Sequence, residues 1–142
     1  MIRHATNTDF YELAELYLDA SLIAHPFIDP AYIARDRRHL REHRLPLEQA
    51  YLWEEKGEIA GYIALEGTQI NGLFIKVEYQ RQGVGRSLIE HAKQLHDQLR
   101  VRVYQENYQA QRFYFAMGFE VVPEVGTPED GPHAQYCMRW PV

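Results

Sequence analysis

The chain contains the stretch Gln80-Arg81-Gln82-Gly83-Val84-Gly85-Arg86-Ser87. It follows an apolar run with strand character, Leu73–Val77, and opens a run for which we predict a helix, Ser87–Leu99. The two glycines let the backbone approach an anion without a Cβ clash, and first-turn N–H groups of the helix then point at the bound oxygens. Arginines at the rim add positive charge. The stretch therefore predicts a phosphate-binding turn between a strand and a helix.

Two better-known glycine loops do not fit this stretch. A dinucleotide-binding loop needs a third glycine three residues after the second, where this chain has Leu88. A nucleoside-triphosphate loop needs Gly-Lys-Ser/Thr, whereas Gly85 is followed by Arg86. What remains is Gln/Arg-x-x-Gly-x-Gly/Ala, and taken alone an ordinary strand-to-helix connection stays open as its explanation.

A second motif lies downstream, within Val103–Phe119. A β-branched strand ends near Val103, Asn107 can cap a helix, and Gly118 can end that helix in the left-handed conformation. Three apolar residues of the segment share one helical face, which favours a helix packed on a core.

The two motifs together resemble the GNAT superfamily of N-acetyltransferases. Gln80, Gly83 and Gly85 fill the diagnostic places of that family's pyrophosphate loop, and the second motif matches its Asn, Ala and Phe-Tyr-x-x-x-Gly-Phe. The resemblance covers nearly the whole chain. It implies an α/β fold with a mixed sheet of about seven strands and about four helices, in one domain over residues 1–142. It also implies an enzyme that uses acetyl-coenzyme A (acetyl-CoA) and no metal.

The same resemblance assigns residues to the cofactor. Leu73, Phe74 and Ile75 would carry the pantetheine arm on backbone groups, and one of their amides would polarise the thioester carbonyl. For Phe74 the alternative is plain core burial. Asn107 would hold the pantetheine and cap the last helix, and the cap alone would also explain it. The pyrophosphate would lie on the loop residues Arg81, Gln82, Gly83, Val84, Gly85, Arg86 and Ser87.

Acetyl transfer to an amine needs a neutral amine, a donor for the developing oxyanion and an acid for the departing thiolate. Tyr114, the Tyr of the second motif, is the expected acid. With a phenol pKa near 10 against a thiol near 8.5, it stays protonated at neutral pH and can hydrogen-bond the sulfur. Without the motif, a half-buried core tyrosine would be the natural interpretation.

The base is not identified by the sequence. Many lysine-acetylating relatives place a Glu five residues before the Asn, where this chain has Arg102. A cation at that place would repel a lysine side chain and favour an acceptor with a carboxylate or phosphate, if Arg102 faces the site. Glu66, Glu106 and His25 are possible substitutes, and His25 has the most suitable unperturbed pKa, near 6.5, although a His before Pro is often structural.

Further segments resemble the YiaC-type branch of bacterial acetyltransferases, which is associated with acetylation of protein lysines. These are Met-Ile-Arg at the start, His25-Pro26-Phe27-Ile28, Tyr104-Gln105-x-Asn107 and Trp140-Pro141-Val142. His25, Phe27 and Arg102 are therefore the acceptor-side candidates. A protein lysine is the expected acceptor, and a small acidic amine is the alternative acceptor. A further alternative is that the protein is not an enzyme but a coenzyme-binding sensor that has lost its base.

Periodicity and turn signals place the other elements. Thr6-x-x-Asp9 resembles a capping box that starts the first helix, a second helix is expected over Ala31–Leu45, and Glu55–Glu58 is expected to turn a hairpin with glycine at a special dihedral. The helix after the glycine turn has a stripe that includes Leu95. Strands are expected over Ile2–Ala5, Ala50–Glu54, Ile59–Leu65, Gln69–Val77, Val101–Val103, Phe119–Val122 and Gln135–Trp140.

Composition limits the classes of partner. A net charge of −5 argues against a general nucleic-acid binder, and no apolar run is long enough for a membrane span. We expect a cytoplasmic protein, monomer or homodimer, and the lone Cys137 in a late strand fits a reducing compartment. The arginine-rich segment 35–44 is either a solvated helix face, paired in part with Asp36 and Glu42, or a surface for an acidic acceptor or the cofactor's 3′-phosphate.

Overall fold

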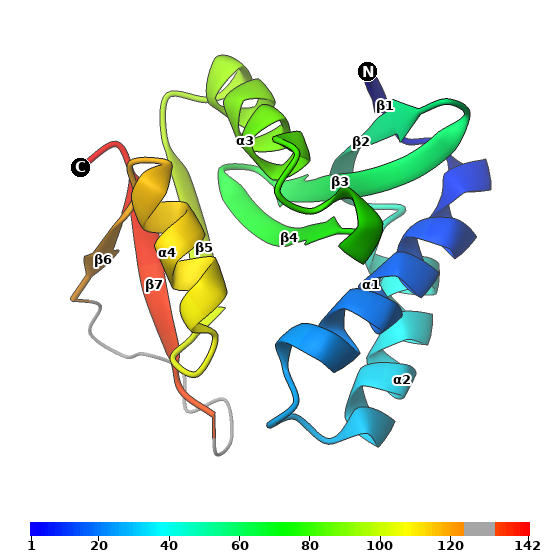
Figure 1. Cartoon of the computed structure of the whole chain (residues 1–142), viewed down its shortest axis with the longest axis horizontal. Coiled ribbons are helices and arrows are strands. Elements are labelled where there is room, and N and C mark those ends of the chain that lie inside the picture. Colours follow the sequence, from blue (N-terminus) through cyan, green and yellow to red (C-terminus); the bar gives the residue numbers. More distant parts are fainter. Residues whose placement is uncertain (124–132) are drawn as a thin grey trace.

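The computed structural model describes residues 1–123 and 133–142. Seven strands in this part of the chain form one mixed sheet in the order β1-β2-β3-β4-β5-β7-β6 (Figure 1). The expected α/β fold with about seven strands is confirmed. The strands are β1 (Ile2–His4), β2 (Gln49–Glu55), β3 (Glu58–Glu66), β4 (Gln69–Ile75), β5 (Leu99–Tyr104), β6 (Glu120–Val122) and β7 (Gln135–Trp140).

Helices cover both faces of the sheet because β3 alternates its buried side chains between two cores. Tyr62 and Ala64 pack with Leu13 of α1, whereas Ile63 and Leu65 pack with Leu88 of α3. The helices are α1 (Phe10–Ala24), α2 (Pro30–His39), α3 (Val84–Leu95) and α4 (Tyr108–Ala116). No helix among residues 1–123 and 133–142 is long and apolar enough to cross a membrane.

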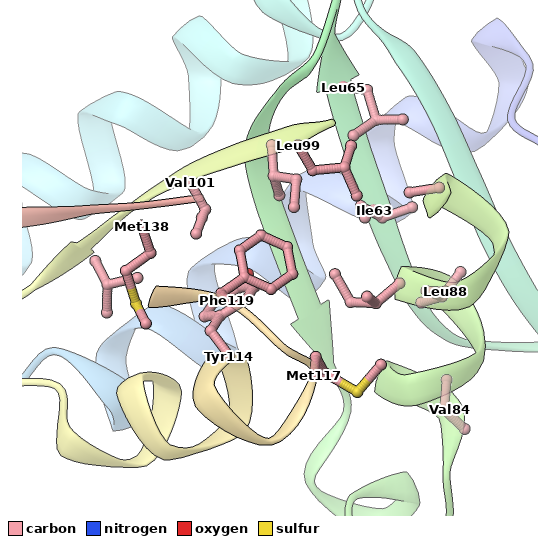
Figure 2. Packing of buried hydrophobic residues seen from close by; sticks show 14 of the residues in the cluster. Ile63, Leu65, Val84, Leu88, Leu99, Val101, Tyr114, Met117, Phe119 and Met138 are labelled. Carbon is pink, nitrogen blue, oxygen red and sulfur yellow. The ribbon is translucent and has the colours of Figure 1, made fainter. Parts of the chain in front are cut away.

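The larger core joins the two halves of the molecule. Figure 2 shows the Phe119 ring next to Tyr114 of α4, with Leu99 of β5 and Ile63 of β3 close by, and all four side chains belong to one buried cluster. The ring centroids of Phe119 and Tyr114 lie 5.2 Å apart in an edge-to-face arrangement. This packing fixes α4 against the sheet and so sets the position of Tyr114.

The expected boundaries of the helix after the glycine turn and of the strand before it were wrong, and the second helix keeps its expected extent but changes its winding. The helix after the glycine turn runs over Val84–Leu95 rather than Ser87–Leu99: Leu99 is fully buried as the first residue of β5, and Leu95 is 45% exposed. β4 ends at Ile75, before a 3₁₀ turn. The second helix changes at Leu40 into a π-helical turn, η2 (Leu40–Arg44).

The two central strands separate along their length. β4 and β5 pair in parallel at Gln69–Arg100 and Ile70–Val101, and beyond these pairs no further pairing joins them in the described part of the chain. In Figure 1, β5 lies with α4 and β7 on one side of the molecule, while β4 continues toward α1 and α2 on the other. The sheet therefore opens in its middle, at the carboxyl ends of both strands.

Candidate functional site

A cavity of about 290 Å³ lies where β4 and β5 separate. One wall comes from α1, α2, the segment between them and η2, and the other from β4, β5 and α4. Residues far apart in the sequence therefore meet in it. Among the lining residues are Tyr17, Ser21, His25, Tyr32, Asp36, Arg44, Gly72, Leu73, Phe74, Arg102, Tyr104, Asn107, Tyr114 and Gln135.

The backbone of β4 presents polar groups to this opening. Lys76 N–H donates to the Ala60 carbonyl of β3, so the backbone groups of Lys76 point toward β3. Along an antiparallel pair, successive residues point their backbone groups alternately toward the partner strand and away from it. The backbone groups of Ile75 and Leu73 then face away from β3, and the Ile75 carbonyl accepts from Gln80 Nε2 at 3.2 Å. By the same alternation the Phe74 amide is turned toward β3, so Leu73 and Ile75 are the residues whose amides reach the opening.

The Phe74 side chain lies on the face of β4 that packs against α1 and the smaller core. Its ring packs edge-to-face on Tyr17, with the centroids 5.3 Å apart, and lies 5.8 Å from the ring of Tyr62. Phe74 is partly buried against the smaller core and also lines the cavity. Its ring thus contributes both to packing and to the wall of the site.

The glycine turn has the geometry of an anion nest. Arg81 and Gly83 are both left-handed, with φ of 63° and 85°, and Gly83 is the N-cap of α3. Alternating backbone conformations of this kind turn successive N–H groups toward one point, where the positive end of the helix dipole adds to them. A Cβ on Gly85 would lie 3.3 Å from the Phe113 ring, so this glycine also lets α3 approach α4.

The remaining loop candidates lie around this turn. Gln82, Arg81 and Arg86 are exposed, and the Gln82 side chain donates to the Glu78 carbonyl at 2.9 Å. Val84 is buried as the first residue of α3, and Ser87 N–H already donates to the Gly83 carbonyl at 3.0 Å. The first-turn amides of Val84, Gly85 and Arg86 therefore remain for an anion.

Asn107 connects α4 to the end of α1. Its Oδ1 accepts the Ala110 N–H at 3.1 Å, which confirms the expected cap, and its Nδ2 lies 3.1 Å from His25 Nε2. Because an amide N–H can only donate, His25 Nε2 is the acceptor and the ring proton sits on Nδ1. Burial lowers the pKa of His25, which keeps the ring neutral. The Nε2 lone pair is therefore already engaged.

Tyr114 lies at the back of the cavity. The residue is 5% exposed, and its ring packs between Phe113 and Phe119. No hydrogen bond to its hydroxyl is recorded within residues 1–123 and 133–142, and burial raises the phenol pKa well above its usual range. Tyr114 therefore stays protonated and offers an O–H donor.

The acceptor-side candidates separate into two groups. His25 and Arg102 line the cavity, whereas Phe27 packs behind it, with its ring 5.6 Å from His25 and 5.4 Å from Tyr104. Neither carboxylate substitute lines the cavity: Glu66 accepts from Asn71 at 3.1 Å and Glu106 lies 3.3 Å from the ring of His133.

Sequence reasoning missed the cavity wall formed by α1, α2 and η2. The Tyr17 hydroxyl donates to Asp36 Oδ2 at 2.6 Å, and an Arg44 guanidinium N–H donates to the same oxygen at 2.9 Å. Ser21 adds a buried hydroxyl without a partner in the described part of the chain. Asp36 and Arg44 belong to the arginine-rich segment 35–44, for which an acceptor surface was one of the two interpretations. Tyr17 and Ser21 belong to no local motif, so only their burial could have marked them.

The arginine-rich segment is mostly a paired, solvent-facing surface. Arg38 pairs with Glu42 and Arg37 with Glu15, and within residues 35–44 only Asp36 and Arg44 line the cavity. The expected pairing with Asp36 and Glu42 is confirmed. The described residues contain no group of three or more His, Cys, Asp or Glu side chains that could hold a metal ion.

Comparisons with known proteins give the family context. A family model described as an acetyltransferase (GNAT) domain matches residues 25–136. The chain is 32% identical to the peptidyl-lysine N-acetyltransferase YiaC of Escherichia coli, over all of this chain and 97% of that protein. It is also 32% identical to the peptidyl-lysine N-acetyltransferase YjaB of Salmonella typhimurium, over 89% of this chain and 91% of that protein.

Solved structures show the same fold. The solution structure of apo YjaB from Escherichia coli matches with a TM-score of 0.85 and 26% identity, over 99% of this chain and 96% of that chain. The crystal structure of the PaiA N-acetyltransferase from Thermoplasma acidophilum in complex with coenzyme A matches with a TM-score of 0.84 and 18% identity, over 100% of this chain and 98% of that chain. At this identity the second match supports the fold alone.

Proposed function

The chain belongs to the acetyltransferase (GNAT) family, and from that premise we propose that it transfers the acetyl group of acetyl-CoA directly to a primary amine, with a protein lysine side chain as the acceptor. One observation carries the proposal: the cavity between β4 and β5 brings the backbone of Leu73, the amide of Asn107 and the hydroxyl-bearing Tyr114 into one wall. The acceptor class follows from the peptidyl-lysine activity named for the two relatives.

The glycine turn and β4 supply the cofactor-binding residues of the proposal. The pyrophosphate is held by the first-turn amides of α3, with Arg81 and Arg86 beside them. The pantetheine arm lies along the open edge of β4 and reaches Asn107. The Leu73 or Ile75 N–H polarises the thioester carbonyl, because those are the β4 amides that face the opening.

Tyr114 is the proposed general acid. Burial raises the pKa of the Tyr114 phenol, so the hydroxyl is an O–H donor at neutral pH. When acetyl-CoA is bound, it supplies a thioester whose sulfur leaves as a thiolate. The Tyr114 hydroxyl then gives its proton to that sulfur and recovers one from the solvent.

A small acidic amine is the second candidate acceptor, and the charge of the cavity favours it. The described lining residues include two arginines, Arg44 and Arg102, and one aspartate, Asp36. Arg102 lines the cavity together with the Asp36–Arg44 pair, and its guanidinium would face a carboxylate or phosphate on such an acceptor. We place either reaction in the cytoplasm, with no nucleic-acid partner, in a monomer or homodimer.

The test is release of free thiol from acetyl-CoA by the purified protein. Lysine-bearing peptides and small amines with and without a carboxylate serve as acceptors, and calorimetry gives the affinity for the cofactor. Turnover on peptides supports the lysine assignment, and turnover only on acidic amines supports the second candidate. Tight cofactor binding without turnover on any amine contradicts the proposed enzyme and favours a sensor.

A further inference from the structure

A second cavity, of about 20 Å³, lies directly beside the larger one. The two cavities share five lining residues, which come from α1, η2 and β4: Tyr17, Arg44, Asn71, Gly72 and Phe74. A volume of this size holds about one water molecule, which needs some 10–15 Å³ and two to four polar partners.

Three buried polar atoms belong to residues that line this small cavity. Arg44 Nε, Glu48 Oε1 and the Tyr62 hydroxyl all lack a hydrogen-bond partner in the described part of the chain. A buried polar group without a partner costs about 1–3 kcal/mol, so three in one place call for a common explanation. One water can accept from the Arg44 N–H and the Tyr62 O–H while it donates to Glu48.

The two oxygens of Glu48 face different surroundings. Oε1 is buried, whereas Oε2 accepts from Asn71 Nδ2 at 2.5 Å, in a hydrogen bond that lies at the protein surface. The same Asn71 amide lies 3.1 Å from Glu66 Oε1, which is also exposed. A proton that Oε1 takes up inside the protein reaches the solvent when the carboxyl group rotates and brings its protonated oxygen to the surface, where Oε2 now lies.

We propose that Glu48, acting through one water held by Arg44 and Tyr62, takes the proton from the acceptor ammonium and passes it to the solvent. This inference rests on the proposed amine acetylation, whose base the sequence leaves unassigned. One N–H bond of the ammonium breaks and its electron pair stays on nitrogen as the nucleophile. The proton goes to the water, which gives one of its own protons to the carboxylate of Glu48.

Among the ionisable groups around the small cavity, Glu48 suits the role of base better than Asp36 or Tyr62. Asp36 Oδ2 already accepts hydrogen bonds from Tyr17 and Arg44 and so has a structural role in the wall. Burial, and the charges of Glu48 and Asp36, raise the pKa of Tyr62, whereas Arg44 lowers it; Tyr62 thus remains a neutral donor.

Gly72 is one of the five residues that line both cavities. A Cβ at this position would lie 3.0 Å from the Phe74 ring and 3.8 Å from the Tyr62 hydroxyl. Glycine therefore leaves space beside the Phe74 ring and the Tyr62 hydroxyl.

The test compares Glu48→Gln with Glu66→Gln, a matched control in which the other carboxylate bonded to Asn71 is neutralised outside both cavities. Thiol release is measured with a lysine peptide from pH 7 to pH 9.5. The neutral fraction of a lysine with pKa near 10.4 rises roughly three-hundredfold over this range. We expect kcat/KM of Glu48→Gln to fall at least about tenfold at pH 7 and to approach the wild-type value at pH 9.5.

A merely structural role of Glu48 predicts a different pattern. A loss that is equal at every pH, or no loss at pH 7, overturns the inference, as does an equal loss in Glu66→Gln. Glu48→Asp should recover part of the rate, and a thialysine peptide, whose amine is less basic, should narrow the difference at pH 7. Calorimetric affinity for acetyl-CoA should stay within about twofold of wild type in each variant.

A crystal structure of the protein with acetyl-CoA tests the water directly. We expect one ordered water in contact with Arg44 Nε, Glu48 Oε1 and the Tyr62 hydroxyl, and an empty cavity overturns the inference whatever the kinetics show. If the wild-type protein acetylates amines but the rate loss in Glu48→Gln is the same at every pH, the proton route is refuted and the proposed function stands. A wild-type protein that binds acetyl-CoA and acetylates no amine removes the proposed function and, with it, the proton route.

Discussion

Replacing Tyr114 with Phe should separate catalysis from folding. The ring contacts with Phe113 and Phe119 survive the change, and no hydrogen bond to described residues is lost. The free energy of unfolding should therefore change by less than about 1 kcal/mol. The rate should fall because the thiolate must leave unprotonated. With a thiol pKa near 8.5, protonation at pH 7 is favourable by about 2 kcal/mol, which limits the loss in kcat to roughly ten- to thirtyfold.

The assay is thiol release at saturating acetyl-CoA, together with urea unfolding and calorimetric cofactor binding. Tyr136→Phe is the matched control, because Tyr136 packs against the same core but does not line the cavity. Its rate should equal that of wild type. An unchanged kcat in Tyr114→Phe refutes the general-acid role, and so does an equal loss in both variants.

Three further changes test the cap, the turn and the first ion pair. Asn107→Ala should lower stability by about 1 kcal/mol and weaken acetyl-CoA binding by calorimetry, whereas Asn107→Asp keeps the cap and should restore stability only. Gly83→Ala and the control Gly57→Ala, both left-handed with room for a Cβ, should each lower stability by about 1 kcal/mol, but only Gly83→Ala should weaken binding. The hydrogen bonds from Arg3 lower the Asp9 pKa to about 2, so Asp9→Asn should lose about 1–2 kcal/mol at pH 7, a deficit that shrinks between pH 4 and pH 2 in urea titrations.

The features that were predicted well from the sequence depend on residues that are adjacent in the sequence. A left-handed residue at Gly57 or Gly118, a capping box from Thr6 to Asp9 and a cap from Asn107 to Ala110 each depend on a few adjacent backbone groups. Chemistry within one turn of chain decides them, and they were confirmed. The glycine turn belongs to the same class, because consecutive amides would bind the phosphate.

The boundaries that sequence predicted wrongly lie where the local pattern fits a helix as well as another element, and tertiary packing decides between them. Leu95 and Leu99 are four residues apart and fit one helical stripe, yet Leu99 is buried in β5. In the second helix, Leu45 N–H donates to the Leu40 carbonyl at 2.8 Å, five residues back. This π-helical turn accompanies the full burial of Leu45 and the approach of Arg44 to Asp36. Propensity contains no signal for such a turn, since its support comes from the packing.

The two halves of the site should therefore respond differently to substitution. In the proposed enzyme the cofactor would be held by consecutive amides at one turn, and a change there should alter the affinity for every acyl donor at once. The opposite wall is built by side chains from α1, η2 and the residue before β2, namely Tyr17, Arg44 and Glu48, which meet only in the folded chain. None of them touches the glycine turn, so their substitution can change which amine reacts, or at which pH, while the coenzyme still binds. Under the proposed function, acceptor choice would depend on side chains that are far apart in the sequence, and for this reason the sequence predicted the cofactor and left the base open.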